Sequence, residues 1–183
     1  MLRRRESPHA LAVDMTGVKM GDRFVQIGCE NPGRLGAIAA KVGLSGRAVA
    51  VVPDESSAAR ARKGAADAGV LVEIEVASPQ RFSAGADAFV LAVVDDTGGL
   101  LVGMRAEDRV AFVRNVHAAL RPGGRVMVIS TAPRGGLGAL LSRTKSGPPF
   151  DPTPSLEADG FRSVRKLAER EGLIFVEGVK PRT

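Results

Sequence analysis

Two short clusters of residues have the types and spacing that chemistry requires, and each directly follows an apolar run. The first is the turn at residues 28–33 (GCENPG), a G-x-x-x-x-G spacing whose glycines let a ligand approach the backbone closely. The second is the pair Asp95-Asp96, whose carboxylates have the chemistry to orient a substrate or to take a proton from it. A solvated turn before Thr97 is the alternative interpretation of this pair.

Glu30 in the first cluster decides which cofactors are compatible with the turn. A carboxylate in the middle of a glycine turn opposes a pyrophosphate, which argues against NAD and FAD. A cofactor that carries positive charge and no phosphate is compatible with Glu30. The plainer interpretation is that Glu30 faces water on a loop.

The single cysteine limits the remaining chemistry. Cys29 cannot form an internal disulfide or supply a cysteine-based metal cluster, and we expect it to be a small buried packing residue. We therefore predict no metal site and, as the default, a reduced cytoplasmic setting. His117 falls late in a predicted helix, where we expect a capping or packing role.

Short β-rich runs alternate with helical patterns from Arg23 onward, which predicts a parallel sheet with helices on both faces. The wholly apolar runs at 48–52 and 88–94 are typical of strands that are buried on both faces. The half-polar run at 70–76, with Glu73 and Glu75 on one side, indicates an edge strand. The predicted strands of this alternating part cover residues 23–28, 48–52, 70–76, 88–94 and 125–130.

Three amphipathic segments between these strands predict helices. One covers about 34–42, a second is opened by residues 53–56 with Asp54 as its N-cap, and a third covers about 106–120. The Pro-Gly-Gly at 122–124 ends the third helix. The side chains that the third helix is predicted to bury are Val110, Val113, Val116 and Leu120.

The amino-acid composition of the chain changes after the fifth predicted strand. Residues 131–155 are rich in Gly, Pro and Ser, and a loop of this length in a compact domain is typical of a lid or a partner surface. Its three basic residues, Arg134, Arg143 and Lys145, suit an anionic small-molecule partner. Residues 163–171 fit a helix or a strand by periodicity alone, and residues 173–179 predict a final strand.

Composition excludes several classes of function. The chain has 183 residues, of which 44% are hydrophobic and 25% charged, as in an ordinary one-domain globular protein. The net charge of +6 favours anionic partners, but aromatic residues make up only 4%, so we do not expect nucleic-acid binding. No apolar run approaches the roughly 20 residues that cross a bilayer, and the N-terminus lacks a signal-peptide pattern. We therefore expect no membrane partner.

Several segments resemble class I S-adenosylmethionine-dependent methyltransferases. Residues 21–29 (GDRFVQIGC) are similar to the strand and turn that open the family's fold, and residues 46–65 are similar to its second strand and helix. Residues 117–128 (HAALRPGGRVMV) resemble the segment that leads into its fifth strand. The ending, from LEADGF to LIFVEGVK, resembles the antiparallel sixth and seventh strands that distinguish this fold from dehydrogenases. The resemblance covers roughly residues 17–180.

The resemblance implies an α/β, Rossmann-like fold with a seven-stranded, mostly parallel sheet in the order 3-2-1-4-5-7-6 and helices on both faces. It makes residues 163–170 the sixth strand. It also divides the chain into an N-terminal extension (1–16) and a methyltransferase-like domain (17–183), within which 131–155 is a lid or interface loop.

By this resemblance, S-adenosylmethionine binds beyond the carboxyl ends of the strands, where the strand order reverses. Asp95 and Asp96 are then the candidate catalytic, substrate-facing groups. The implied cofactor contacts are Gln26, Gly28, Cys29, Glu30, Gly33, Val52, Pro53, Asp54, Ser78, Pro79 and Val94.

Three positions depart from the family's pattern, and at each the family places a carboxylate. This chain has Gln26 at the end of the first strand, Val52 at the end of the second with Asp54 two residues later, and Ala-Ser-Pro at 77–79 after the third. Glu30 can take the role of the missing acid at position 26. Each buried polar group left unpaired costs about 1–3 kcal/mol, and about 1.4 kcal/mol is tenfold in affinity.

Two functions are consistent with these residues. The first is an S-adenosylmethionine-dependent methyltransferase with a small-molecule acceptor of unknown identity. The second is a catalytically silent relative, a pseudoenzyme kept as a binding or assembly module, with weak or no cofactor binding and homodimerisation through 131–155. The strand framework favours the first function, and the three missing carboxylates favour the second. A nucleotide-binding dehydrogenase is disfavoured by Glu30 and by the C-terminal hairpin.

Overall fold

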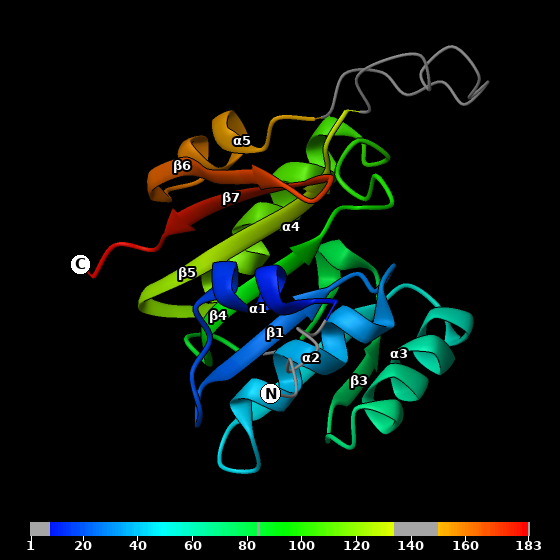
Figure 1. Ribbon diagram of the computed structural model, residues 1–183. Helices are drawn as coiled ribbons and strands as arrows, with labels where there is room; N and C mark the ends of the chain where they lie inside the picture. The colour runs from blue at the N-terminus through cyan, green and yellow to red at the C-terminus, as the bar shows by residue number, and fades with distance from the viewer. Residues whose placement is uncertain (1–7, 84, 134–149, 183) are drawn as a thin grey trace, which may run out of the picture.

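A seven-stranded sheet organises the computed structural model, which describes residues 8–83, 85–133 and 150–182 (Figure 1). The strand order is β3-β2-β1-β4-β5-β7-β6, which confirms the order implied by the family resemblance. The strands are β1 (Arg23–Ile27), β2 (Arg47–Val52), β3 (Glu73–Val76), β4 (Phe89–Asp95), β5 (Leu120–Thr131), β6 (Arg162–Arg170) and β7 (Leu173–Val179).

Strands β1 to β5 pair in parallel, whereas β7 is antiparallel to both of its neighbours, β5 and β6. The turn between β6 and β7 holds Glu171 at φ 55° and Gly172 at φ 74°. Two successive positive φ values are typical of the type I′ turn, which joins antiparallel strands tightly. The segment that periodicity left open, 163–170, is thus a strand, because it pairs along β7.

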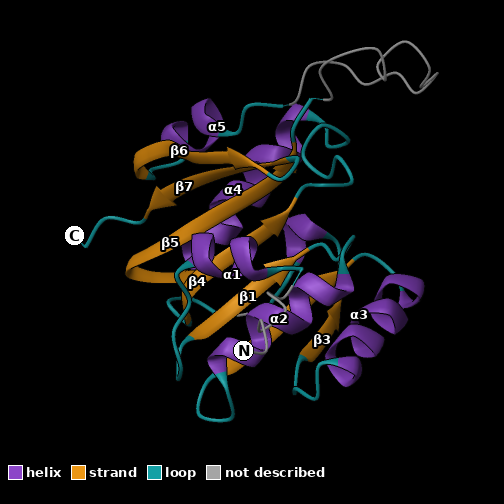
Figure 2. Cartoon of the chain, viewed as in Figure 1, coloured by secondary structure: helices purple, strands orange, loops and turns teal. Residues whose placement is uncertain are grey.

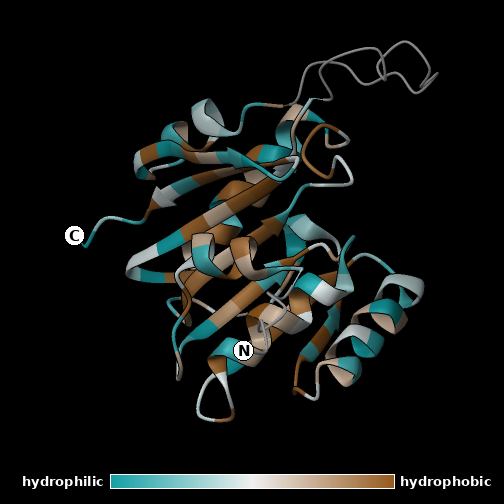
Figure 3. Ribbon diagram, in the orientation of Figure 1, coloured by the Kyte–Doolittle hydropathy of each residue, from teal (hydrophilic) through white to brown (hydrophobic). Residues whose placement is uncertain are grey.

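Helices cover both faces of this sheet (Figure 2). On one face lie α1 (Ala10–Thr16), α2 (Pro32–Val42) and α3 (Glu55–Asp67). On the other lie η1 (Pro79–Arg81), α4 (Ala106–Ala119) and α5 (Thr153–Ala158). Helix α1 comes from the segment that the sequence sets apart as an N-terminal extension, and it packs against α2. Figure 3 shows the hydrophobic residues concentrated along the central strands between these layers.

The caps of α2 and α3 are set by side chains that precede each helix. The side chain of Asn31 accepts a hydrogen bond from the Arg34 backbone N–H at 3.0 Å. Asp54 accepts one from the Ser57 backbone N–H at 2.7 Å, which confirms the predicted N-cap. The two helices pack closely, because a Cβ added at Gly36 would lie 2.7 Å from the carbonyl oxygen of Gly64.

The predicted buried face of α4 is wrong at one position. Val110 is 40% exposed, whereas Phe112, which the prediction omits, is 1% exposed. Val113 and Val116 are buried as predicted, and with Phe112 they define a face from which position 110 is turned away at 3.6 residues per turn. Among the described residues, no helix combines the length and apolar character needed to span a bilayer.

Candidate functional site

The carboxyl ends of β1, β2, β3 and β4 meet at one edge of the sheet, on both sides of the point where the strand order reverses. The backbone N–H of Gly28 donates to the carbonyl of Val51 at 2.9 Å, and that of Ala77 donates to Val52 at 3.0 Å. These bonds continue the strand pairing beyond the strand ends. They bring the predicted segments 28–33, 52–54, 77–79 and 94–96 to the same edge, where doubly wound sheets bind ligands.

Backbone geometry explains the glycines of residues 28–33, which we name the β1 turn. Gly28 has φ 83°, and a Cβ added there would lie 2.9 Å from the carbonyl oxygen of Asp95. A Cβ added at Gly33 would lie 2.7 Å from Nε2 of His9, so the start of the N-terminal helical segment lies against the turn. The turn is therefore packed between β4 and the residue that precedes α1.

Gln26 holds the inner side of the β1 turn without a charge. Its side chain is buried, and Nε2 donates to the carbonyl oxygen of Gly28 at 3.0 Å. Among the described residues, Oε1 of Gln26 accepts no hydrogen bond. The position where the family carries an acid is therefore occupied by a neutral side chain that supports the turn through its amide.

Asp95 is completely buried and bonds to the β1 turn. Its Oδ2 accepts hydrogen bonds from the backbone N–H groups of Glu30 at 3.1 Å and Asn31 at 3.3 Å. Its Oδ1 accepts from Nη2 of Arg34 at 2.6 Å and from Oγ1 of Thr97 at 2.6 Å. The carboxylate thus links the end of β4 to the start of α2.

Arg34 belongs to the site through its contact with Asp95, although the candidate residues predicted from the sequence do not include it. It is 4% exposed, and its Nη2 also donates to Oγ1 of Thr97 at 3.1 Å. A signal was present, because Arg34 precedes Ile38 and Val42 by four and eight residues and so falls on the apolar face of α2. A cation at an apolar helical position predicts a buried anionic partner, which is Asp95.

Asp96 lies on the opposite side of the sheet from Asp95, because successive residues of a strand alternate in direction. Its Oδ1 accepts a hydrogen bond from the backbone N–H of Leu101 at 2.7 Å. Burial raises the pKa of Asp96 to about 6; the bond from Leu101 opposes this rise, and the charge of Asp95 adds to it. At neutral pH the group is ionised and able to accept a proton.

Cys29 and Glu30 differ in exposure although they are adjacent. Cys29 is 3% exposed, which confirms it as a packing residue, and burial followed by the charge of Asp95 raises its pKa to about 11. Glu30 is exposed, and its side chain lies against Gly98, where an added Cβ would be 2.6 Å from Cγ of Glu30. Its carboxylate is thus the acidic group on the outer side of the β1 turn.

The remaining predicted contacts offer few polar side chains. Val52 is 1% exposed and packs in the apolar cluster beneath α2 and α3, and Val94 is buried on the other face. Pro53 is exposed, and so is Asp54, whose pKa is lowered because its carboxylate accepts the Ser57 backbone N–H. Ser78 is exposed just before η1, whose first residue is Pro79.

No group of three His, Cys, Asp or Glu side chains in the described ranges could hold a metal ion.

A cavity of about 250 Å³ lies on the α4 side of the sheet, at the carboxyl end of β5. Ser130 and Val176 belong to its wall, together with Phe150, over whose ring the Arg109 guanidinium lies at 4.4 Å. Because Asp95 pairs with Ile129 in the β4–β5 register, Ser130 is the neighbour of Asp96 on this face. Asp96, the first residue after β4, is thus separated from the cavity by one strand position, and the cavity wall itself contains Ser130 and not Asp96.

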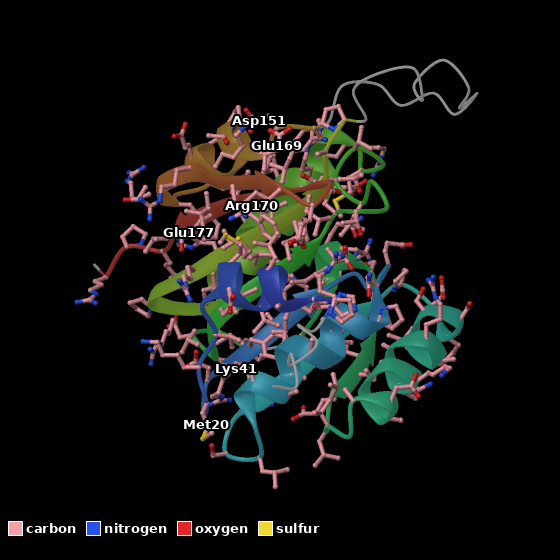
Figure 4. All side chains as sticks on the ribbon, in the orientation of Figure 1. Met20, Lys41, Asp151, Glu169, Arg170 and Glu177 are labelled. Carbon is pink, nitrogen blue, oxygen red and sulfur yellow. The ribbon has the colours of Figure 1, made fainter. Side chains whose placement is uncertain are left out.

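Both signs of charge line this cavity. Lys166 contributes an ammonium that pairs with Glu169 at 2.9 Å, and Asp151 contributes a carboxylate. Figure 4 shows Asp151 and Glu169 at the same end of the molecule. The basic residues that favoured an anionic acceptor, at positions 134, 143 and 145, lie outside the described residues.

Comparison with solved structures finds the same fold in proteins of low sequence identity. A methyltransferase from Aquifex aeolicus, described as S-adenosylmethionine-dependent, superposes with a TM-score of 0.72 at 17% identity over 94% of this chain and 89% of that one. The S-adenosylmethionine-dependent methyltransferase SibL gives 0.71 at 23% identity over 96% of this chain and 55% of its own. The [4+2]-cyclase SpnF gives 0.68 at 16% identity, covering 96% and 81%.

These likenesses define the class of fold. The strand order with its reversed β7, together with the superposition on S-adenosylmethionine-dependent methyltransferases, gives this chain the class I methyltransferase fold. No family model matches the sequence, and no curated protein sequence matches it. The fold also occurs in a protein described as a cyclase, so the reaction must be argued from the site.

Proposed function

We propose that this protein is an S-adenosylmethionine-dependent methyltransferase that acts on a small molecule. The observation that carries the proposal is the β1 turn, which lies at the carboxyl edge of the sheet where strand order reverses between β1 and β4. The structural neighbours described as S-adenosylmethionine-dependent methyltransferases support it. The single buried cysteine supports a cytoplasmic location, which we propose with it.

The side chains at this edge fit the cofactor at the turn and fit it less well at the ribose. S-adenosylmethionine carries an ammonium and a sulfonium but no phosphate, and Glu30 offers an exposed carboxylate on the outer side of the turn. For the ribose hydroxyls, Val52 contributes no acceptor, because its side chain is aliphatic and also buried. Asp54 is the nearest acid in the sequence, and its carboxylate already caps α3. We therefore expect weak binding that depends on Glu30.

Methyl transfer requires only two contributions from the side chains of this protein. Bound S-adenosylmethionine supplies an electrophilic methyl group. The chain must align an acceptor with it and remove the acceptor's proton, and alignment alone contributes much of the rate in such displacements. We assign the removal of this proton to Asp96, because its carboxylate is ionised above a pKa of about 6 and because its neighbour on β5, Ser130, lines the cavity.

The cavity at the end of β5 is the proposed acceptor site. About 250 Å³ is slightly below the usual range for ligand pockets, so it suits a small acceptor. Among the described residues, the charged groups at this cavity are one cation, Lys166, and two carboxylates, those of Asp151 and the neighbouring Glu169. Because the negative charges outnumber the positive one, the cavity does not favour an anionic acceptor. We therefore propose a small neutral molecule that presents a hydroxyl or a similar acidic group to Asp96.

Calorimetric titration with S-adenosylmethionine and S-adenosylhomocysteine tests this function. Both compounds carry the ammonium, so Glu30→Gln should weaken both by the same factor, about tenfold for the loss of about 1.4 kcal/mol. Glu55→Gln is the matched control, because Glu55 is an exposed acid on α3 whose carboxylate pairs with Arg62 at 3.3 Å. Unchanged affinity in Glu30→Gln removes Glu30 from the site, and no heat at high micromolar ligand refutes the methyltransferase.

A catalytically silent binding or assembly module is the second candidate. Two observations favour it: the buried Val52 at the ribose position and the engagement of Asp54 as a helix cap. The protein would then act as a homodimer joined through residues 131–155. Replacing 134–149 with a short Gly-Ser linker should convert a dimer to a monomer in sedimentation equilibrium. A wild-type monomer, or a dimer that survives the replacement, contradicts this assembly.

A further inference from the structure

Arg34 and Asp95 form a buried ion pair beneath the β1 turn. The side chains of Arg34 and Asp95 are 4% and 0% exposed, and the two charged groups meet at 2.6 Å. Removing one partner of a buried pair leaves the other charge uncompensated where water cannot reach it. On the α2 face of the sheet, Arg34 is the buried cation among the described residues near the β1 turn, and its guanidinium compensates one carboxylate, that of Asp95.

Asp95 uses its charge to hold the β1 turn. Its Oδ2 receives the backbone N–H groups of Glu30 and Asn31, which are the last two residues before α2. Hydrogen bonds to an ionised acceptor are stronger than those between neutral groups. The carboxylate therefore sets the conformation of the same residues that present the Glu30 side chain to a ligand.

Gln26 approaches the same turn from β1. It pairs with Val93 in the register between β1 and β4, so residues 26 and 95 lie on neighbouring strands and point to the same face of the sheet. Its Nε2 donates to the carbonyl of Gly28 at 3.0 Å. A carboxylate at position 26 would face that carbonyl with no proton to donate, and it would add a second negative charge near one arginine.

We infer that Asp95 is the positioning residue of the β1 turn, and that Gln26 is neutral because Arg34 compensates a single buried carboxylate. The acid that supports the turn thus comes from β4 and not from β1. Asp95 holds the turn and is not a proton acceptor, which leaves that role to Asp96. The inference rests on the proposed function only for its ligand-binding readout.

Moving the charge between the two positions tests the inference. Asp95→Asn and Gln26→Glu are close in size to the residues that they replace, and each upsets the charge balance with Arg34. We expect each variant to lower the urea midpoint and to weaken S-adenosylhomocysteine binding by at least about tenfold. The double variant again has one carboxylate for one guanidinium. Its affinity for S-adenosylhomocysteine should be about tenfold higher than the affinity expected if the two single-variant losses simply multiplied.

The matched control removes a charge one residue further along. Asp96→Asn combined with Gln26→Glu has the same net charge as the first double variant, but Asp96 bonds the Leu101 backbone N–H and not the turn. In this control we expect the two effects to be additive, so the stabilisation that Asp96→Asn produces by itself does not count as recovery. Recovery in the control, or additive losses in the first double variant, would falsify the inference. Should the single variants fail to fold, folding of the first double variant counts as recovery, and its failure refutes the charge balance.

Amide hydrogen exchange separates this inference from the proposed function. In Asp95→Asn the amides of Glu30 and Asn31 should exchange faster than in the wild type, whereas in Asp96→Asn they should not. If the wild-type protein binds neither S-adenosylmethionine nor S-adenosylhomocysteine, the proposed function falls. The exchange rates and urea midpoints then still decide whether Asp95 holds the turn.

Discussion

Replacing Asp96 with asparagine should stabilise the protein more at neutral pH than at acidic pH. Asp96 is 6% exposed as a residue, and burial is the main cause that raises the pKa of its carboxyl group from 3.8 to about 6. Because the folded state binds this proton more tightly than the unfolded chain does, the contribution of Asp96 to stability is full below pH 3.8. It then falls as the pH rises to about 6.

The size of the effect follows from these two pKa values. Each pH unit between them corresponds to about 1.4 kcal/mol, so ionised Asp96 costs the folded state about 3 kcal/mol at pH 7.5. At pH 4.5 the group is still protonated in the folded state, and the cost is about 1 kcal/mol. Asparagine cannot ionise, and its carbonyl can still accept the Leu101 N–H. The free-energy difference between variant and wild type should therefore grow by about 2 kcal/mol between the two pH values.

Urea unfolding of both proteins at pH 4.5 and 7.5 measures this change. Any fixed effect of the substitution cancels, because only the difference between the two pH values is compared. Asp22→Asn serves as a control, since Asp22 is a carboxylate near the surface that bonds the Lys19 backbone N–H at 2.8 Å. A difference for Asp96→Asn that is equal at both pH values, or one that grows toward acid, would refute the assignment of Asp96 as a buried acid with a raised pKa.

Three further substitutions or treatments test the surroundings of the site. Asp54→Ala removes the N-cap of α3 and should lower the melting temperature by about 2–4 °C in scanning calorimetry; an unchanged value contradicts the capping role. Gly36→Ala should lower it much further, because the new Cβ would meet the backbone oxygen of Gly64 at 2.7 Å, and normal stability would show that α2 and α3 can separate without cost. Cys29 should react with iodoacetamide at pH 8 about a hundredfold more slowly in the folded protein than in urea, since its pKa rises from 9.0 to about 11; equal rates would show an exposed thiol.

Local patterns in the sequence predict the frame of this protein well. Apolar runs, half-polar runs and turn residues define the parallel strands, because a strand's exposure repeats every two residues and is visible within the run itself. The cap at Asp54 is equally local, since its partner is three residues away. Val110 shows the limit of such reasoning: several faces of α4 carry apolar residues, and contact with the sheet chooses among them.

Periodicity left segment 163–170 open, and the family resemblance made it a strand. Its pairing with β7 confirms this assignment, because the second strand supplies the hydrogen-bond partners that a single run of residues cannot show.

The sequence by itself determined the order of elements, the glycine turn after β1 and the presence of two adjacent acids at the end of β4. Only the tertiary structure decided what those acids do. Asp95 bonds to Arg34, which is 61 positions away in the sequence, because β1 and β4 are neighbours in the sheet. Asp96 points to the other face, where burial removes its carboxylate from water. A carboxylate's bonds and pKa depend on what surrounds it in space, and that is set by strand register, which no short stretch of the chain encodes.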